Sequence, residues 1–215
     1  MKMALIKVCG ITGAADAAAA VAAGAGALGF NFYARSPRCV APAAARAIIA
    51  GLPQEVLAVG VFVNEASPTE VVRKAEAAGV GAVQLHGEES PEFCAAVSEL
   101  ACVPVIKALR VGADFTPAAA ARYERAHAVL LDAYSPHAHG GTGHVFDWTL
   151  ARRTRELVAR LYLAGGLTAE NVAAAVAAVR PFAVDVCSGV EAAPGRKDAA
   201  RLRAFCAAVR AADSL

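Results

Sequence analysis

The chain has 215 residues, a formal net charge of +2 and a hydrophobic fraction of 57%, to which alanine contributes heavily. This length is typical of one large α/β domain, so we expect a single domain over residues 1–215. The small net charge, without a basic run, argues against a nucleic-acid partner. The longest apolar runs are far shorter than the ~20 residues of a membrane-spanning helix, which argues against a membrane protein.

Cysteine usage and the first residues indicate the compartment. The six cysteines are Cys9, Cys39, Cys94, Cys102, Cys187 and Cys206. None has C-x-x-C spacing, which favours free thiols in a reducing cytoplasm over disulfides or zinc. The strand-like first eight residues lack a small-residue cleavage site, so we expect no signal peptide and a cytoplasmic protein. We expect Cys94, Cys102 and Cys206 to be small core residues.

Strand-like apolar runs alternate with stretches of helical character along the whole chain. The runs lie at 4–9, 26–32, 56–63, 80–85, 103–108, 128–132, 160–164 and 182–187. They are almost continuously apolar, as is typical of parallel strands that are covered on both faces. Eight strands that alternate with eight helices predict a (β/α)₈ TIM barrel, with an open doubly wound sheet as the alternative.

Several helix boundaries can be predicted from local signals. The segment Ser67-Pro68-Thr69-Glu70 has the pattern of a capping box with proline at the first helical position, and Gly79 supplies the stop. Ser90-Pro91 and Thr116-Pro117 predict two further helix starts of the same kind. The helix before Arg180-Pro181 is expected to end there.

Two reactive side chains stand at the ends of predicted strands. Cys9 ends the first apolar run, before a strand-breaking glycine and Thr12, which could cap a helix. Asp132 ends the sixth run in the same way. Barrel enzymes present catalytic groups at the carboxyl ends of their strands. One potential base and one potential acid therefore predict proton-transfer chemistry.

Two glycine-bearing loops follow the last two predicted strands. Gly165 and Gly166 come after the seventh strand, and Ser188 and Gly189 come after the eighth. In TIM barrels the loops at these two places commonly hold a phosphate with backbone N–H groups. Tight turns alone would also explain the glycines, but two such loops at both places favour a phosphate site.

Two other patterns carry less weight. Residues 24–29 match G-x-G-x-x-G, but they follow a predicted helix and lead into a strand, the reverse of a dinucleotide-binding motif. His137, His139 and His144 could suggest a metal site. Their surrounding glycines and the lack of nearby carboxylates favour a loop instead, so we expect no metal.

Seven motifs in chain order resemble the phosphoribosylanthranilate isomerase family from the first strand to the last helix. They are KVCGIT, GFNFYARSPRCV, VGVFVNE, VQLHGEE, LLDAY…GGTGHVFDW, LAGGLTAENV and VDVCSGVEAAPGRKD. The resemblance implies a barrel without metal or organic cofactor. It also implies an Amadori rearrangement of N-(5-phosphoribosyl)anthranilate to the 1-deoxyribulose phosphate in tryptophan biosynthesis.

The resemblance assigns roles to the two strand-end residues. Asp132 matches the general acid, which would protonate the ribose ring oxygen and open the ring to a Schiff base. Cys9 matches the general base, which would remove a proton from the second sugar carbon. An unperturbed thiol has a pKa of about 8.5, and the N-terminus of the following helix could favour the thiolate.

Three further residues match the family's active site. Arg38 corresponds to an arginine near the anthranilate group, where a planar guanidinium suits the carboxylate. His86 resembles an active-site histidine that contacts either substrate or another side chain. Asp185 is expected to orient loop N–H groups or to contact a sugar hydroxyl. Cys187 stands where a serine is common and Cys39 where an aromatic residue is usual.

Two alternative functions remain at this point. The related isomerase of histidine biosynthesis shares the fold and the chemistry, but it typically carries an aspartate in place of Cys9 and handles two phosphates. A non-catalytic phosphosugar-binding barrel would bind ligand without turnover. The sequence leaves the choice between monomer and homodimer open. It also leaves open whether the loop at 133–143 closes over the substrate.

Overall fold

The computed structural model describes residues 3–133 and 147–212. In that part of the chain, parallel strands close a barrel in which each strand pairs with its sequence neighbours and β8 pairs with β1. Its eight strands are β1 (Leu5–Cys9), β2 (Ala27–Asn31), β3 (Leu57–Phe62), β4 (Ala82–Leu85), β5 (Val105–Val111), β6 (Ala128–Ala133), β7 (Leu161–Leu163) and β8 (Ala183–Val186). The (β/α)₈ prediction is confirmed, and the open doubly wound sheet is excluded.

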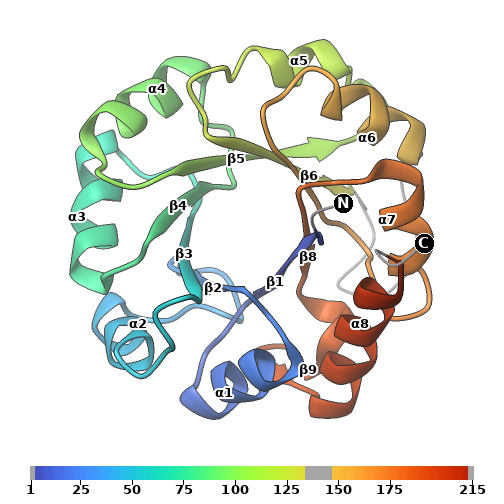
Figure 1. Cartoon of the computed structure of the whole chain (residues 1–215). Coiled ribbons are helices and arrows are strands. Elements are labelled where there is room, and N and C mark those ends of the chain that lie inside the picture. The colour runs from blue at the N-terminus through green and yellow to red at the C-terminus, as the bar shows by residue number, and fades with distance from the viewer. Residues whose placement is uncertain (1–2, 134–146, 213–215) are drawn as a thin grey trace.

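Helices surround the strands as an outer ring (Figure 1). They are α1 (Ala14–Ala23), α2 (Pro42–Ile49), α3 (Pro68–Ala78), α4 (Pro91–Leu100), α5 (Pro117–Ala121), α6 (Trp148–Arg155), α7 (Val172–Val179) and α8 (Ala199–Ala212). A short 3₁₀ turn, η1 (Ser188–Val190), and a small hairpin of β9 (Glu191–Ala193) and β10 (Arg196–Lys197) lie between β8 and α8. The sequence did not indicate this hairpin.

Most of the predicted helix boundaries are confirmed. Ser67 caps α3 by accepting a hydrogen bond from the N–H of Glu70, and Gly79 ends the helix in the left-handed region. Ser90 caps α4 in the same way. Thr116 precedes α5 as expected, but its side chain makes no capping hydrogen bond.

Two other local expectations are corrected. Gly13, not Thr12, is the N-cap of α1, because the Thr12 hydroxyl donates to the carbonyl of Gly195 at 2.6 Å. Cys94 and Cys206 are buried as expected, whereas Cys102 is exposed. Gly24 ends α1 and leads into β2, so the 24–29 pattern has the reversed order that the sequence indicated.

The hydrophobic core has two parts. The larger part lies between the barrel and the helices and includes Phe30, Phe62 and Phe205. The smaller part fills the barrel itself with mostly small side chains and one tyrosine, Tyr162. This packed interior is typical of TIM barrels, where the space inside the strands is a core rather than a pore. None of the described helices combines the length and apolar character needed to cross a membrane.

Candidate active site

The alternation of side chains along each strand places the two candidate catalytic residues at one end of the barrel. Ala128 and Leu130 belong to the barrel-filling core, so Asp132 continues the same inward-facing series at the end of β6. Leu5 packs against that core, so Lys7 and Cys9 continue the inward series of β1. Both residues therefore lie at the carboxyl end of the barrel. Between β6 and β1 run β7 and β8, which carry the glycine loops.

Asp132 is hydrogen-bonded to His86, which follows the end of β4. The Nε2 atom of His86 lies 3.2 Å from Oδ2 of Asp132. The Nδ1 atom of His86 accepts a hydrogen bond of 2.8 Å from the amide of Gln84, which is fully buried. With Nδ1 as the acceptor, the ring proton lies on Nε2 and points at Asp132. In the sequence, the only sign of a role for Gln84 is its polar side chain inside an apolar strand.

The thiol of Cys9 has its pKa held well below the usual value. The main cause of the lowered pKa is a hydrogen bond from the Cys187 thiol. Burial acts in the opposite direction and raises the pKa. The charges of Lys7, His86 and Lys197 lower it further. The sequence suggested the N-terminus of the next helix instead, but α1 begins only at Ala14. The side chains around Cys9 therefore favour a thiolate.

Lys7 and Asp185 form a buried ion pair inside the barrel, next to Cys9. The Nζ atom of Lys7 lies 2.9 Å from Oδ1 of Asp185, and their side chains are 0% and 7% exposed. Burial disfavours the ammonium, but the charges of Asp185 and Cys9 outweigh it and hold the pKa of Lys7 above its usual value. In this structure the carboxylate of Asp185 is bound by Lys7 rather than by loop N–H groups. Contact with a sugar hydroxyl stays a prediction.

The two predicted phosphate loops lie against each other. A Cβ atom at Gly189 would lie 2.1 Å from the carbonyl oxygen of Leu167, so only glycine allows this approach. Gly165 and Gly166 both adopt positive φ angles, of 85° and 66°. Asn171 fastens their loop by donating to the carbonyl of Gly166 and accepting from the N–H of Thr168. The structure thus brings together the glycines that the sequence paired.

Arg38 lies in the β2–α2 loop and contacts the hairpin after β8. Its Nε and Nη2 atoms donate to the two carboxylate oxygens of Glu191, at 2.8 and 2.6 Å. Lys197 donates to the same carboxylate at 2.9 Å. Burial would raise the pKa of Glu191, but the hydrogen bonds from Arg38 and Lys197 hold it below the usual value. The sequence did not single out Glu191 or Lys197, although both lie in the motif that contains Ser188 and Gly189.

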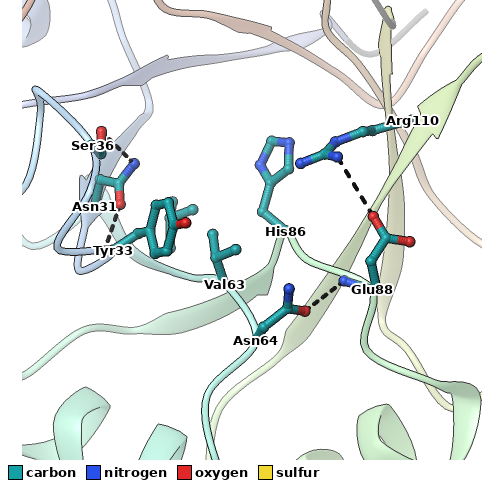
Figure 2. Close-up of a pocket in the computed structure, with 9 residues that line it drawn as sticks. Asn31, Tyr33, Ser36, Val63, Asn64, His86, Glu88 and Arg110 are labelled. Carbon is teal, nitrogen blue, oxygen red and sulfur yellow. Dashed lines mark hydrogen bonds and ion pairs between the residues drawn. The ribbon is translucent and has the colours of Figure 1, made fainter.

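A pocket of about 440 Å³ opens beside His86 at the ends of β2 to β5 (Figure 2). Tyr33 and Asn31 form one side of it, and Arg110 lies on the other side beside His86. The guanidinium of Arg110 is 3.5 Å from the carboxylate of Glu88, and both side chains are exposed. Arg110 is a second arginine, besides Arg38, at this end of the barrel, and the sequence did not reveal it.

A buried network fixes the loop that carries His86. The carboxylate of Glu89 accepts hydrogen bonds from the N–H groups of Asn64 and Gly87 and from Lys107, the last at 2.6 Å. Lys107 and Glu89 are almost completely buried. Glu89 thus ties the segments that follow β3 and β4 to Lys107 of β5, and these contacts hold the loop that begins at His86.

Some predicted features lie outside the described residues. These are His137, His139, His144 and all but the first residue of the loop at 133–143. Within residues 3–133 and 147–212, no three histidine, cysteine or acidic side chains gather as a possible metal-binding group.

Comparison with known proteins gives one consistent result. The family model for N-(5'-phosphoribosyl)anthranilate isomerase matches residues 6–208. The N-(5'-phosphoribosyl)anthranilate isomerase of Pelobacter propionicus is 52% identical over 201 residues, which are 93% of this chain and 92% of that protein. That of Geobacter metallireducens is 52% identical over 204 residues, or 94% of this chain and 97% of that protein.

Solved structures agree with the sequence matches. The phosphoribosylanthranilate isomerase of Thermotoga maritima superimposes with a TM-score of 0.88 at 42% identity, over 97% of this chain and 100% of that one. An isomerase in complex with reduced 1-(o-carboxyphenylamino)-1-deoxyribulose 5-phosphate gives 0.84 at 40% identity, with the same coverage. A third structure, of monomers generated from the dimeric Thermotoga maritima isomerase, gives 0.85 at 41% identity, again over 97% and 100%.

Proposed function

Because the chain belongs to the N-(5'-phosphoribosyl)anthranilate isomerase family, we propose how its own residues carry out the reaction of that family. The enzyme converts N-(5-phosphoribosyl)anthranilate to 1-(2-carboxyphenylamino)-1-deoxyribulose 5-phosphate in tryptophan biosynthesis. The reaction moves protons between carbon and oxygen and changes no net oxidation state. It therefore needs an acid, a base and groups that hold the two ends of the substrate.

The phosphate end of the substrate binds at the loops after β7 and β8. The observations that support this are the positive φ angles of Gly165 and Gly166 and the close approach of Gly189 to Leu167. Among the described residues, no protein acceptor takes the N–H groups of Gly165 and Gly166. These donors, with Ser188 and Gly189, are suited to phosphate oxygens.

Asp132 acts as the general acid in the first step. Its proton goes to the ribose ring oxygen while the bond between that oxygen and the first sugar carbon breaks. The anthranilate nitrogen supplies the electron pair, which gives an iminium ion. The Nε2–H of His86 then donates to the newly formed carboxylate of Asp132 across the 3.2 Å hydrogen bond. His86 is therefore a positioning residue for the acid.

Cys9 acts as the general base in the second step. The iminium ion acidifies the neighbouring C–H bond, and the thiolate takes that proton from the second sugar carbon to leave an enolamine. The enolamine becomes the ketone when its first carbon gains a proton and its hydroxyl loses one. Turnover is complete when Cys9 has lost its proton and Asp132 has regained one. The single observation that carries this scheme is the placement of both groups at the same barrel end, on either side of the phosphate loops.

The anthranilate carboxylate binds Arg38. Two of the five N–H donors of the guanidinium are used on Glu191, which leaves three for the substrate. Glu191 holds the guanidinium plane in place, so little freedom is lost when the substrate binds. Arg110, at the pocket beside His86, is the competing cation and is tested below.

The remaining expectations concern the whole protein. Residues 1–215 form one domain, and the protein works in the cytoplasm. It is a monomer or a homodimer; a dimeric relative supports the second form. Asp185 contacts a sugar hydroxyl through the carboxylate oxygen that Lys7 does not bind.

Turnover of freshly prepared phosphoribosylanthranilate tests the proposal. The wild-type protein and the Asp132→Asn variant are assayed side by side for product by chromatography. We expect rapid conversion by the wild type and a loss of about 10²- to 10⁴-fold in the variant. Phosphosugar binding without turnover by the wild type would contradict the proposed mechanism and would favour the non-catalytic barrel.

A further inference from the structure

Cys9 has a second thiol as its neighbour across the seam where the barrel closes. The registers of β1 and β8 pair Lys7 with Asp185 and Val8 with Val186. Cys9 is the last residue of β1 and Cys187 directly follows the last residue of β8, so the positions next to the Val8–Val186 pair are these two cysteines. The inward-facing series of the two strands continues to these residues, since Lys7 and Asp185 both point into the barrel. The two cysteines are therefore neighbours at the carboxyl end of the barrel.

The backbones of the two cysteines are also held together. The ammonium of Lys197 donates to the carbonyl of Cys9 at 2.6 Å and to the carbonyl of Cys187 at 3.3 Å. Neighbouring strands are about 4.7–4.9 Å apart, which lies within the Cα separation of roughly 4.4–6.8 Å that disulfides span. Lys197 also donates to the Cys187 sulfur at 3.9 Å, so its ammonium contacts the backbone of one cysteine and both backbone and side chain of the other. Rotation of the two side chains could thus close an S–S bond without a change of fold.

The surroundings divide the roles of the two sulfurs. The Cys187 sulfur also lies 3.8 Å from a carboxylate oxygen of Glu191, and this nearby acceptor favours the protonated thiol. Cys9 lies beside the ammonium of Lys7, which favours a thiolate. Both residues are partly exposed, so a small oxidant can reach them. A partly exposed thiolate next to a second cysteine is the arrangement typical of peroxide-sensitive sites.

We propose that Cys9 and Cys187 form a peroxide-oxidation site in which a reversible disulfide switches off the isomerase. The Cys9 thiolate attacks one oxygen of a peroxide, the O–O bond breaks, and Cys9 becomes a sulfenic acid while hydroxide or alkoxide leaves. The Cys187 sulfur then attacks the Cys9 sulfur, and the sulfenic oxygen leaves as water with the Cys187 proton. The two cysteines are oxidised by two electrons, and the peroxide is reduced. A dithiol restores both thiols by exchange.

The loss of activity rests on the role of Cys9 proposed above, because a disulfide sulfur cannot accept a proton from carbon. Formation of the disulfide itself does not rest on that role. Cross-linking and activity are therefore measured separately on the same samples. Exposed Cys39 and Cys102 are first changed to serine, so that they cannot cross-link chains.

The experiment treats this protein with hydrogen peroxide and follows intact mass, a non-reduced tryptic digest and turnover. We expect a mass lower by two hydrogens, one cross-linked peptide pair that contains Cys9 and Cys187, and full recovery with dithiothreitol. The matched Cys187→Ser protein should instead gain oxygen on Cys9, trap dimedone and recover poorly after long exposure. The turnover rate of each peroxide-treated protein is compared with the rate of the same protein before treatment.

Each outcome bears on a separate part of the proposal. Oxygen gain without the cross-link in the protein that keeps Cys187, or equal recovery with and without Cys187, would overturn the oxidation site. The cross-link with undiminished turnover would overturn the switch and also the assignment of Cys9 as the base. The cross-link with parallel loss of turnover, both reversed by dithiothreitol, supports the oxidation site and the switch.

Discussion

The Nε2 atom of His86 lies 3.2 Å from Oδ2 of Asp132. This hydrogen bond connects the end of β4 to the end of β6 at the mouth of the barrel. Gln84 binds the other ring nitrogen from within β4. The acid is therefore oriented by a chain of two side chains, in which the buried amide fixes the ring and the ring fixes the carboxyl group. A misplacement of about 1 Å can cost on the order of 100-fold in rate.

Replacement of His86 tests this positioning role. We expect His86→Asn to lower kcat by about 10- to 100-fold with little change in KM, because the side chain acts through Asp132 rather than by holding substrate. Steady-state kinetics measures both constants. A large rise in KM at unchanged kcat would show that His86 binds substrate instead.

The two arginines at the mouth of the barrel, Arg38 and Arg110, can be told apart by conservative variants. Arg38→Lys keeps a charge near Glu191 but loses the planar fork, so we expect kcat/KM to fall by about 10- to 100-fold. Arg110→Lys should change kcat/KM by less than about threefold. The side chain of Arg110 is exposed, and its guanidinium makes a surface ion pair of 3.5 Å with the carboxylate of Glu88. The reverse order of effects would assign the anthranilate carboxylate to Arg110.

The eight strands and most helix starts could be predicted because they depend on local patterns. Cys9 and Asp132 could be placed in one site for a related reason: the carboxyl ends of parallel strands share one edge. The side chains that these site residues contact could not be predicted from the sequence. Lys7 pairs with Asp185 from 178 positions away, and Arg38 pairs with Glu191 from 153 positions away. Such contacts exist only after β8 closes on β1.

The lysines inside apolar strands were a signal that the sequence already contained. Lys7 and Lys107 interrupt otherwise apolar runs, and a buried lysine requires an anionic partner. The sequence does not reveal which carboxylate supplies it, because Asp185 and Glu89 are only two of 19 acidic residues. Thr12 shows the opposite case: its local pattern suits a cap, but the carbonyl of Gly195, brought near by the hairpin, binds its hydroxyl.

The lowered pKa of Cys9 predicts the pH dependence of its alkylation. Only the thiolate reacts, and a lowered pKa means that the thiolate is already abundant below the usual pKa of about 8.5. The rate with iodoacetamide should therefore rise with pH and reach its plateau at a lower pH than for a free thiol. Peptide mass spectrometry resolves Cys9 from Cys94, whose buried thiol has a pKa raised to about 12 and should stay unmodified.

Variants of Cys187 provide the control for that profile. Cys187→Ala removes the hydrogen-bond donor, so the alkylation profile of Cys9 should move to higher pH. Cys187→Ser keeps an O–H donor and should retain most of the original profile. Identical profiles for all three proteins would show that Cys187 does not set the ionisation of Cys9.

The contact between the phosphate loops predicts the effect of one added methyl group. Gly189→Ala would place Cβ at 2.1 Å from the carbonyl oxygen of Leu167, so the two loops must separate. We expect KM to rise at least tenfold, an order-of-magnitude figure for the loss of one or two charge-assisted hydrogen bonds. Gly13→Ala is the matched control, because nothing lies within 4 Å of its Cβ position. Equal KM values for the two variants would argue against a phosphate site at Gly189.

The most direct test of the mechanism is single-turnover conversion of saturating phosphoribosylanthranilate by Cys9→Ser. Serine is close to cysteine in size, but its hydroxyl cannot act as a base at neutral pH. With a folded variant confirmed by circular dichroism, we predict a rate about 10²- to 10⁴-fold below that of the wild type and unchanged substrate binding. A rate within about threefold of the wild type would contradict the assignment of Cys9 as the group that removes the carbon-bound proton.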